Sequence, residues 1–220
     1  MLSRRQFFTR AGAVGVSLTA AVALPGAMSR VRVYANSLPP VRDTINGILS
    51  FIVPGNDPYS RAQGMATDRP GGVSPGIPES LEKTLDRAVP FPVLGPAFGI
   101  TLPGAAAIAA LINIFAVTLN PGSVRGQFAA PFANLSHREK AQVFEMLDTN
   151  PLLPGLPIKF AVNAIPTLAA FAAYSEVSAF DTGSKRLTGR PVGWELSKYE
   201  GVSDGWDEFR GYYQGVTTID

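Results

Sequence analysis

The chain contains no cysteine and only one histidine, His137. Without cysteine it can form no disulfide, thiolate metal site, iron–sulfur cluster or thiol nucleophile. A single imidazole also excludes a metal site built on several histidines and an acid–base pair of two imidazoles. The sequence therefore predicts no catalytic residues, no metal site and no cofactor of the chain's own.

Charged residues are also scarce, at 16% of 220 residues, whereas 46% are hydrophobic. This apolar content is sufficient for one domain with a buried core. Five of the 19 Lys and Arg residues lie in residues 1–35, which contain no acid, so residues 36–220 carry 14 basic and 17 acidic side chains. Because the basic residues of this mature part are scattered, we expect no binding of nucleic acid.

Glycine and proline, in contrast, are abundant, with 22 Gly and 19 Pro residues. Such usage predicts short or interrupted helices and long connections. We expect an all-α fold, an irregular helical bundle of about five helices with long Pro/Gly-rich loops. It would form a single domain over residues 36–220, with an aromatic-rich tail at 193–220.

The first residues resemble a twin-arginine export signal, because a Ser-Arg-Arg motif with two phenylalanines precedes an uncharged, weakly hydrophobic stretch at 11–28. We expect a signal peptide over residues 1–35, cleaved after Ala35 or, alternatively, after Ala23. It would direct the folded chain through the twin-arginine translocase to the periplasm or the extracellular face of the cytoplasmic membrane. The alternatives are an uncleaved membrane anchor and a chance pair of arginines. The motif consists of Ser3, Arg4, Arg5, Phe7 and Phe8.

Hydrophobic spacing predicts a first amphipathic helix over residues 41–52, stopped by a Pro-Gly pair. A second helix would begin at Pro78, with Glu79 and Lys83 paired on its outer face. The Gly- and Pro-rich segment between these helices is too long for a simple connection in a compact domain, and we expect it to be a loop.

Residues 104–119 are almost wholly apolar, which allows two interpretations. We favour the central helix of a soluble bundle, buried on all sides. A transmembrane helix is the alternative, but its length would be marginal between Pro103 and Pro121.

Ser136 and Glu139 form a predicted capping box before a helix that carries Val143, Phe144 and Leu147 on one face. His137 lies in the first turn of this helix. A catalytic histidine needs a nucleophile and an orienting carboxylate, and the sequence indicates neither, so we expect a solvated surface residue.

A last long helix is predicted over residues 158–178, interrupted at Pro166 and packed against the central helix. Its apolar residues surround much of the cylinder: Phe160, Val162, Ile165, Leu168, Phe171 and Tyr174.

The tail at 193–220 combines many aromatic residues with arginine and acids, a composition typical of interface hot spots. It is therefore a candidate partner interface, with packing onto the chain's own core as the alternative. The interface candidates are Trp194, Tyr199, Trp206, Phe209, Arg210, Tyr212 and Tyr213.

Asp204, Asp207 and Glu208 in the same tail would suit a carboxylate-based hydrolase. The last two are adjacent, however, and would point in different directions on a helix, while Asp204 would suit a helix cap. An exported enzyme that uses these carboxylates thus remains an alternative function.

Several features together resemble the small subunit (subunit 3, or gamma) of gluconate 2-dehydrogenase and related flavin-dependent dehydrogenases. They are the twin-arginine start, the run Phe51–Pro58 after the first helix, the Gly-rich stretch to Gly76 and the helix after Leu135. The resemblance implies a noncatalytic subunit that binds a flavoprotein oxidoreductase of the glucose–methanol–choline type, with FAD in that partner. It also implies that this chain supplies the export signal, and that the complex can associate with the membrane.

Two segments depart from the pattern of that family, namely the uncharged run within 88–124 and the aromatic tail. These two departures make a divergent member of the family, with a different partner, an alternative. A membrane-embedded envelope protein, spanning the bilayer with residues 104–119, is the remaining alternative function.

Overall fold

The computed structural model describes residues 39–88, 102–149 and 157–199. The predicted signal peptide and most of the aromatic tail lie outside these ranges. Within them the chain is mostly helical, with one small antiparallel pair of strands, which confirms the predicted all-α fold. The helices are α3 (Val41–Ile52), α4 (Pro58–Ala62), α5 (Ile77–Ala88), α6 (Gly104–Leu119), α7 (His137–Thr149), α8 (Pro157–Tyr174) and α9 (Val192–Ser197).

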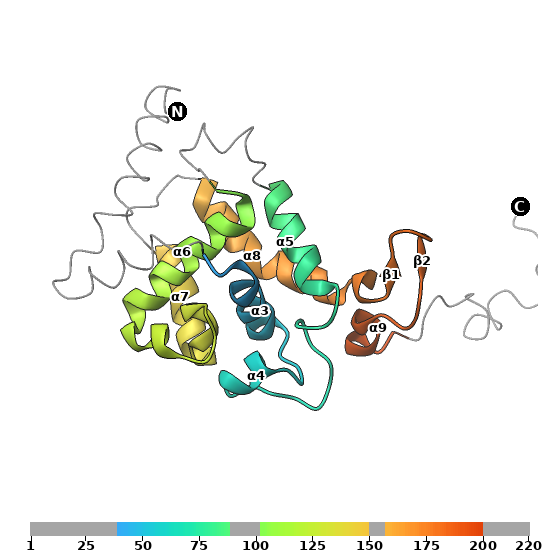
Figure 1. The fold of residues 1–220 in the computed structure, drawn as a ribbon, viewed down its shortest axis with the longest axis horizontal. Coiled ribbons are helices and arrows are strands. Elements are labelled where there is room, and N and C mark those ends of the chain that lie inside the picture. The colour runs from blue at the N-terminus through green and yellow to red at the C-terminus, as the bar shows by residue number, and fades with distance from the viewer. Residues whose placement is uncertain (1–38, 89–101, 150–156, 200–220) are drawn as a thin grey trace, which may run out of the picture.

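Short 3-10 helices and a hairpin connect these helices. The 3-10 helices are η2 (Pro121–Arg125), η3 (Pro131–Asn134) and η4 (Glu176–Ser178), and the strands are β1 (Phe180–Asp181) and β2 (Arg186–Leu187). Helix α3 lies in the middle of the bundle, in contact with α5, α6, α8 and η3 (Figure 1). The hairpin and α9 follow α8 and lie at one end of the molecule (Figure 1).

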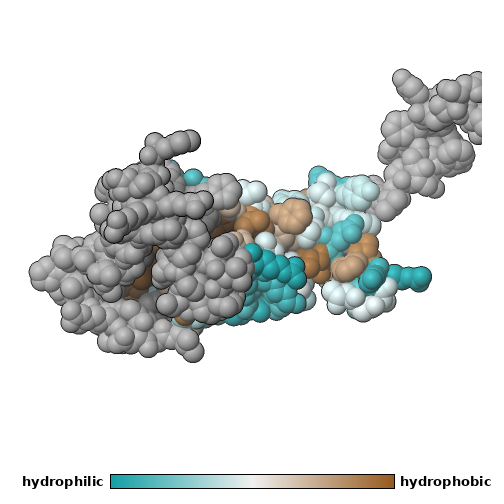
Figure 2. Space-filling view, turned by 90° about the horizontal axis from the view of Figure 1, so that it is seen from above, coloured by the Kyte–Doolittle hydropathy of each residue, from teal (hydrophilic) through white to brown (hydrophobic). Residues whose placement is uncertain are grey.

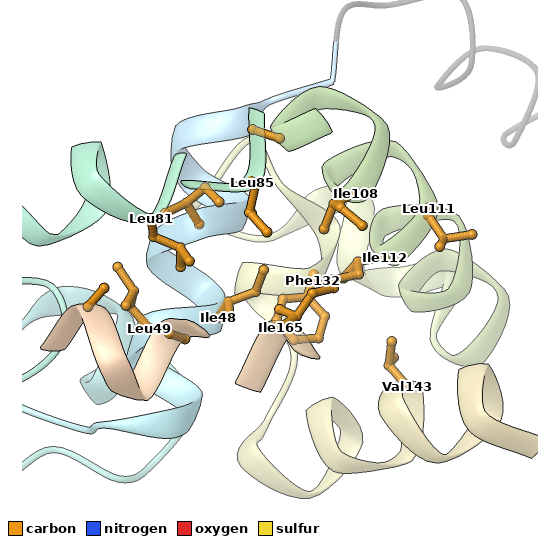
Figure 3. Close-up of a cluster of buried hydrophobic side chains, with 14 of the residues drawn as sticks. Ile48, Leu49, Leu81, Leu85, Ile108, Leu111, Ile112, Phe132, Val143 and Ile165 are labelled. Carbon is orange, nitrogen blue, oxygen red and sulfur yellow. The ribbon is translucent and has the colours of Figure 1, made fainter. Parts of the chain in front are cut away.

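The core forms around α3, whose residues Ile45, Ile48 and Leu49 are fully buried. These positions share one face at helical spacing, as the sequence predicts. Phe132 of η3 fills the space between α3, α6 and α8 (Figure 3). The largest aromatic side chain of the core therefore comes from a short 3-10 turn rather than from one of the predicted helices.

Helix α6 lies against α3, α5 and α7, in agreement with the favoured interpretation of a core helix. It is not buried on all sides, because Ala106, Ala110 and Ile114 on one face are half-exposed. Among the described helices, none combines the length and the apolar character that crossing a bilayer requires.

One buried polar side chain, Asn113, connects α6 to its neighbours. Its Nδ2 donates to Thr44 Oγ1 at 2.7 Å and to the Ala109 carbonyl oxygen at 2.8 Å. Its Oδ1 accepts from the Phe132 backbone N–H at 2.9 Å. A single amide thus satisfies polar groups of α3, α6 and η3 where water has no access.

The predicted loop after α3 contains a helical turn, α4, which the sequence analysis missed. Asp57 caps α4 by accepting from the Ser60 backbone N–H at 2.9 Å, and Pro58 occupies the first turn. The chain returns beside its own start, where Gly71 lies directly against Gly55. The Gly72 N–H donates to the Val53 carbonyl oxygen at 2.9 Å, so the base of this loop is closed by hydrogen bonds.

The predicted pairing of Glu79 with Lys83 is wrong. Glu79 instead forms an ion pair with Arg42 of α3, and Glu82 pairs with the same guanidinium at 2.9 Å. The long-range ion pair forms because α5 packs along α3, which brings the Arg42 side chain between the two carboxylates.

The capping box at the start of α7 is confirmed. Ser136 Oγ donates to Glu139 Oε2 at 2.7 Å, and the Ser136 backbone N–H donates to the same oxygen at 2.9 Å. His137 is not simply a solvated residue, because it is half-buried and its ring centroid lies 4.8 Å from that of Phe51.

Candidate protein-interaction surface

Helix α8 turns its small residues toward the bundle and its largest described aromatic residues away from it. Ala169, Ala172 and Ala173 are buried, whereas Phe171 is 73% exposed and Tyr174 is 51% exposed. The predicted cylinder of apolar residues therefore has an exposed side, which carries Phe171 and Tyr174. Alanine allows α8 to lie close to α3 and α5, and at 100° per residue the bulky side chains then fall on the outer face.

The end and the main contacts of α8 also differ from the prediction. The helix stops at Tyr174 rather than at Ser178, and η4 follows after Ser175. Ser175 Oγ accepts from the Val177 N–H at 3.4 Å at the start of that turn. Among the described residues, α8 packs mainly against α3, α5, α7 and α9, rather than against the central helix α6.

The hairpin after η4 adds a second exposed apolar pair. Phe180 of β1 and Leu187 of β2 are directly opposite in the register, so both side chains lie on one face of the ribbon. They are 43% and 37% exposed. Asp181 Oδ1 and Oδ2 accept from the Gly183 and Ser184 N–H groups at 3.0 and 3.1 Å, which holds the turn.

Helix α9 returns the chain to the end of α8. A Cβ atom at Gly193 would lie 2.3 Å from the Tyr174 carbonyl oxygen, so only glycine allows this close approach. Trp194 is half-buried, and its ring meets that of Tyr199 edge to face with the centroids 5.1 Å apart. Lys198, with φ of 57°, ends the helix in the left-handed region.

These elements make one end of the molecule rich in exposed apolar side chains, and we call it the aromatic end. Figure 2 shows hydrophobic side chains at the surface between the bundle and the hairpin. The contacts of α8 with α9 and η4, and of α9 with η4, hold the region together. The aromatic end consists of Phe171, Tyr174, Phe180, Leu187 and Tyr199, together with Trp194, whose ring contacts that of Tyr199 edge to face.

Basic side chains lie beside this apolar surface. Lys185, Arg186, Arg190 and Lys198 are all exposed. Arg190 donates to the Tyr199 carbonyl oxygen. Among the described residues, no ion pair within 4.0 Å joins any of these four cations to a carboxylate.

The predicted interface residues have different outcomes. Tyr199 is exposed and Trp194 half-buried at the aromatic end, while Trp206, Phe209, Arg210, Tyr212 and Tyr213 lie outside the described residues. Asp204, Asp207 and Glu208, the alternative catalytic carboxylates, lie outside them as well. The sequence analysis missed Phe171, Phe180 and Leu187, although the alanines of α8 at helical spacing could have identified its inner face.

A second polar site lies inside the bundle, around the fully buried Lys140 of α7. Its Nζ donates to Gln63 Oε1 at 2.7 Å and to Ser50 Oγ at 3.4 Å. Gln63 Nε2 in turn donates to the Ser50 carbonyl oxygen at 2.6 Å. Burial lowers the pKa of Lys140 to about 7, and the charge of Asp57 opposes this change.

The part of the chain that the structure describes contains no cluster of three or more His, Asp or Glu side chains that could hold a metal ion. Comparisons of the whole chain with protein-family models, with curated proteins and with solved structures found no significant match.

Proposed function

We propose that this chain is a noncatalytic subunit that binds a flavin-dependent oxidoreductase and accompanies it through twin-arginine export. The observation that carries the proposal is the aromatic end, where Phe171 and Tyr174 remain exposed on a helix with a buried alanine face. Large aromatic side chains that are exposed together mark surfaces that a partner covers. Tyrosine and tryptophan also dominate interface hot spots.

Two features of the sequence support the choice of partner. The twin-arginine motif suits a protein that is exported folded, and this route is often used by proteins that acquire a cofactor before they cross the membrane. The resemblance to the small subunits of flavin-dependent dehydrogenases points to the same class of partner. In this proposal FAD belongs to the partner, and the complex resides in the periplasm or at the outer face of the cytoplasmic membrane.

The test is to purify the tagged full-length protein from the envelope of its native host under mild conditions. We expect a second chain in a stoichiometric amount, together with flavin absorbance. The double variant Phe171→Glu/Tyr174→Glu should reduce the recovered partner at least tenfold, a loss of about 1.4 kcal/mol of binding, because two charges would face an apolar surface.

The matched control is Thr167→Glu, which places one charge on the same exposed side of α8 and should retain the partner. Circular dichroism would establish that each variant is folded. A colourless protein without a partner would contradict the proposal. A partner that stays bound to the folded double variant would exclude the aromatic end as its binding surface.

A further inference from the structure

We propose that the closed bundle disfavours the ammonium form of Lys140, and that protonation of this amine therefore shifts the loop carrying α4 toward release from α7. The inference concerns the interior of the bundle and is independent of the proposed function. The contact between the α4 loop and α7, which are far apart in the sequence, would then depend on pH.

The hydrogen bonds around Lys140 match a neutral amine. Its Nζ has two oxygen acceptors, Gln63 Oε1 at 2.7 Å and Ser50 Oγ at 3.4 Å. A neutral amine has two N–H groups to donate, whereas an ammonium group has three. The face of the Phe132 ring also lies near Nζ, with its centroid 5.6 Å away, and it would offset only part of the cost of burying an ammonium group.

Asp57, the carboxylate whose charge acts on Lys140, does not neutralise an ammonium group at this position. The carboxylate of Asp57 raises the pKa of Lys140, but it forms no ion pair with it. Asp57 instead accepts from the Ser60 backbone N–H at 2.9 Å and from Ser60 Oγ at 2.6 Å. Within the described residues, a protonated Lys140 would therefore be a buried charge without a carboxylate in direct contact, which is costly.

Other titratable groups near the site are engaged elsewhere. Tyr59 of α4 donates to Asp43 of α3 at 2.6 Å, and burial raises the pKa of Tyr59 to about 12, so it stays neutral. On α7 itself, His137 lies against Phe51, and Glu139 accepts from Ser136 and Asn120. Helix α6 carries no charged residue, and η3 contributes the Phe132 ring.

Gln63 is the point at which a charged Lys140 would separate the two segments. Its side-chain Oε1 accepts from Lys140, and its side-chain Nε2 donates to the Ser50 carbonyl oxygen. Its backbone carbonyl oxygen accepts from the His137 backbone N–H at 3.3 Å. Water stabilises an ammonium group better than the closed site does, and water reaches Nζ only if these contacts open. Opening would therefore free the turn that follows α4, while the hydrophobic core around α3 stays closed.

The expected pH dependence follows from the two pKa values. The pKa of Lys140 is about 7 in the folded state, and 10.5 is the ordinary value that it regains when hydrated. Between these values the open state binds one more proton than the closed state. The opening equilibrium should thus increase by up to tenfold for each pH unit from about 10 down to 7, and level off below.

Two measurements on the full-length protein test this inference. The first is the pKa of Lys140, followed by NMR of its Cε in lysine-labelled protein, with about 7 as the expected result. The second is hydrogen exchange of the Gln63 and Met65 amides, which donate to Tyr59 and Ser60 carbonyl oxygens at 3.1 and 2.9 Å. After correction for intrinsic exchange, their protection should fall by up to tenfold for each unit from pH 9.5 to 7.

Lys140→Met should remove this pH dependence, and Lys83→Met, at an exposed lysine of α5, should leave it unchanged. If Lys140→Met does not fold, the NMR titration of the native protein still decides. A Lys140 pKa close to 10.5, or protection that does not vary between pH 7 and 9.5, would overturn the inference.

Discussion

Replacing Gly71 with valine should lower the free energy of unfolding by about 3 kcal/mol, the upper part of the range for forced overpacking. A Cβ atom at this position would lie 2.6 Å from the Gly55 Cα and 2.7 Å from the Val53 carbonyl oxygen. Both neighbours are backbone atoms at the base of the α4 loop, so no flexible side chain can move aside. The new side chain would force apart the two backbone segments that lie against each other there, one at Gly55 and one at Gly71.

Urea unfolding followed by circular dichroism would measure the effect. The matched control is Gly189→Val in the loop between β2 and α9, because a Cβ there meets no atom within 4 Å and φ lies outside the left-handed region. It should change the free energy of unfolding by less than about 0.5 kcal/mol. Equal midpoints for the two variants would show that the crossing at Gly55 tolerates a side chain.

The helices that the sequence predicts well are those with an unambiguous apolar stripe and a clear boundary. Helix α3 has both, since Ile45, Ile48 and Leu49 share one face and Pro54 follows its end. The start of α7 is also encoded locally, because Ser136 and Glu139 are close enough in sequence to cap it without help from the rest of the fold.

Helix α4 shows that a local signal can be present and still be missed. Asp57 followed by Pro58 is a strong helix start, and Ser60 provides the capped N–H. The many glycines and prolines around it suggest a loop, and the helix has only 5 residues. A short helix of this kind depends on tertiary contacts, here those of Gln63 with Ser50 and Lys140.

The aromatic end could not be derived from hydrophobicity alone. Nearly all of the described part of α8 is apolar, so its composition does not indicate which side faces the bundle. The choice is made by packing distance, because the alanine side allows α8 to approach α3 and α5 closely. Phe171 and Tyr174 are then exposed on the outer face, although their hydrophobicity alone would predict burial.

Lys140 is the opposite case, a charged residue on a buried face. It precedes Val143 and Leu147 by three and seven positions, so helical spacing places it on the same inner side. The preference of lysine for the surface argues against that position. Its acceptors, Ser50 and Gln63, come from segments 90 and 77 residues away, and no local pattern could have indicated them.

Replacing Asn113 with leucine should be the second severe change, with a loss of about 3 kcal/mol in the free energy of unfolding. The two side chains are similar in size, but leucine cannot accept from the Phe132 N–H, which would be left buried without an acceptor. Leucine also cannot donate to Thr44 Oγ1. The change would therefore weaken the connection of α6 to η3 and to α3 at once.

Asn113→Asp separates the acceptor from the donor role of this side chain. Aspartate retains an oxygen for the Phe132 N–H but cannot donate to Thr44 when it is ionised, and it buries a charge. We expect it to be at least as destabilising as leucine at pH 7. Thermal unfolding followed by circular dichroism would compare these variants with Asn163→Leu at an exposed position of α8, which removes only an exposed hydrogen bond to Asp148 and should cost less than about 1 kcal/mol. If Asn113→Leu matched that control, the buried amide would not be what connects α6 to α3 and η3, and apolar packing around Phe132 would have to account for their association.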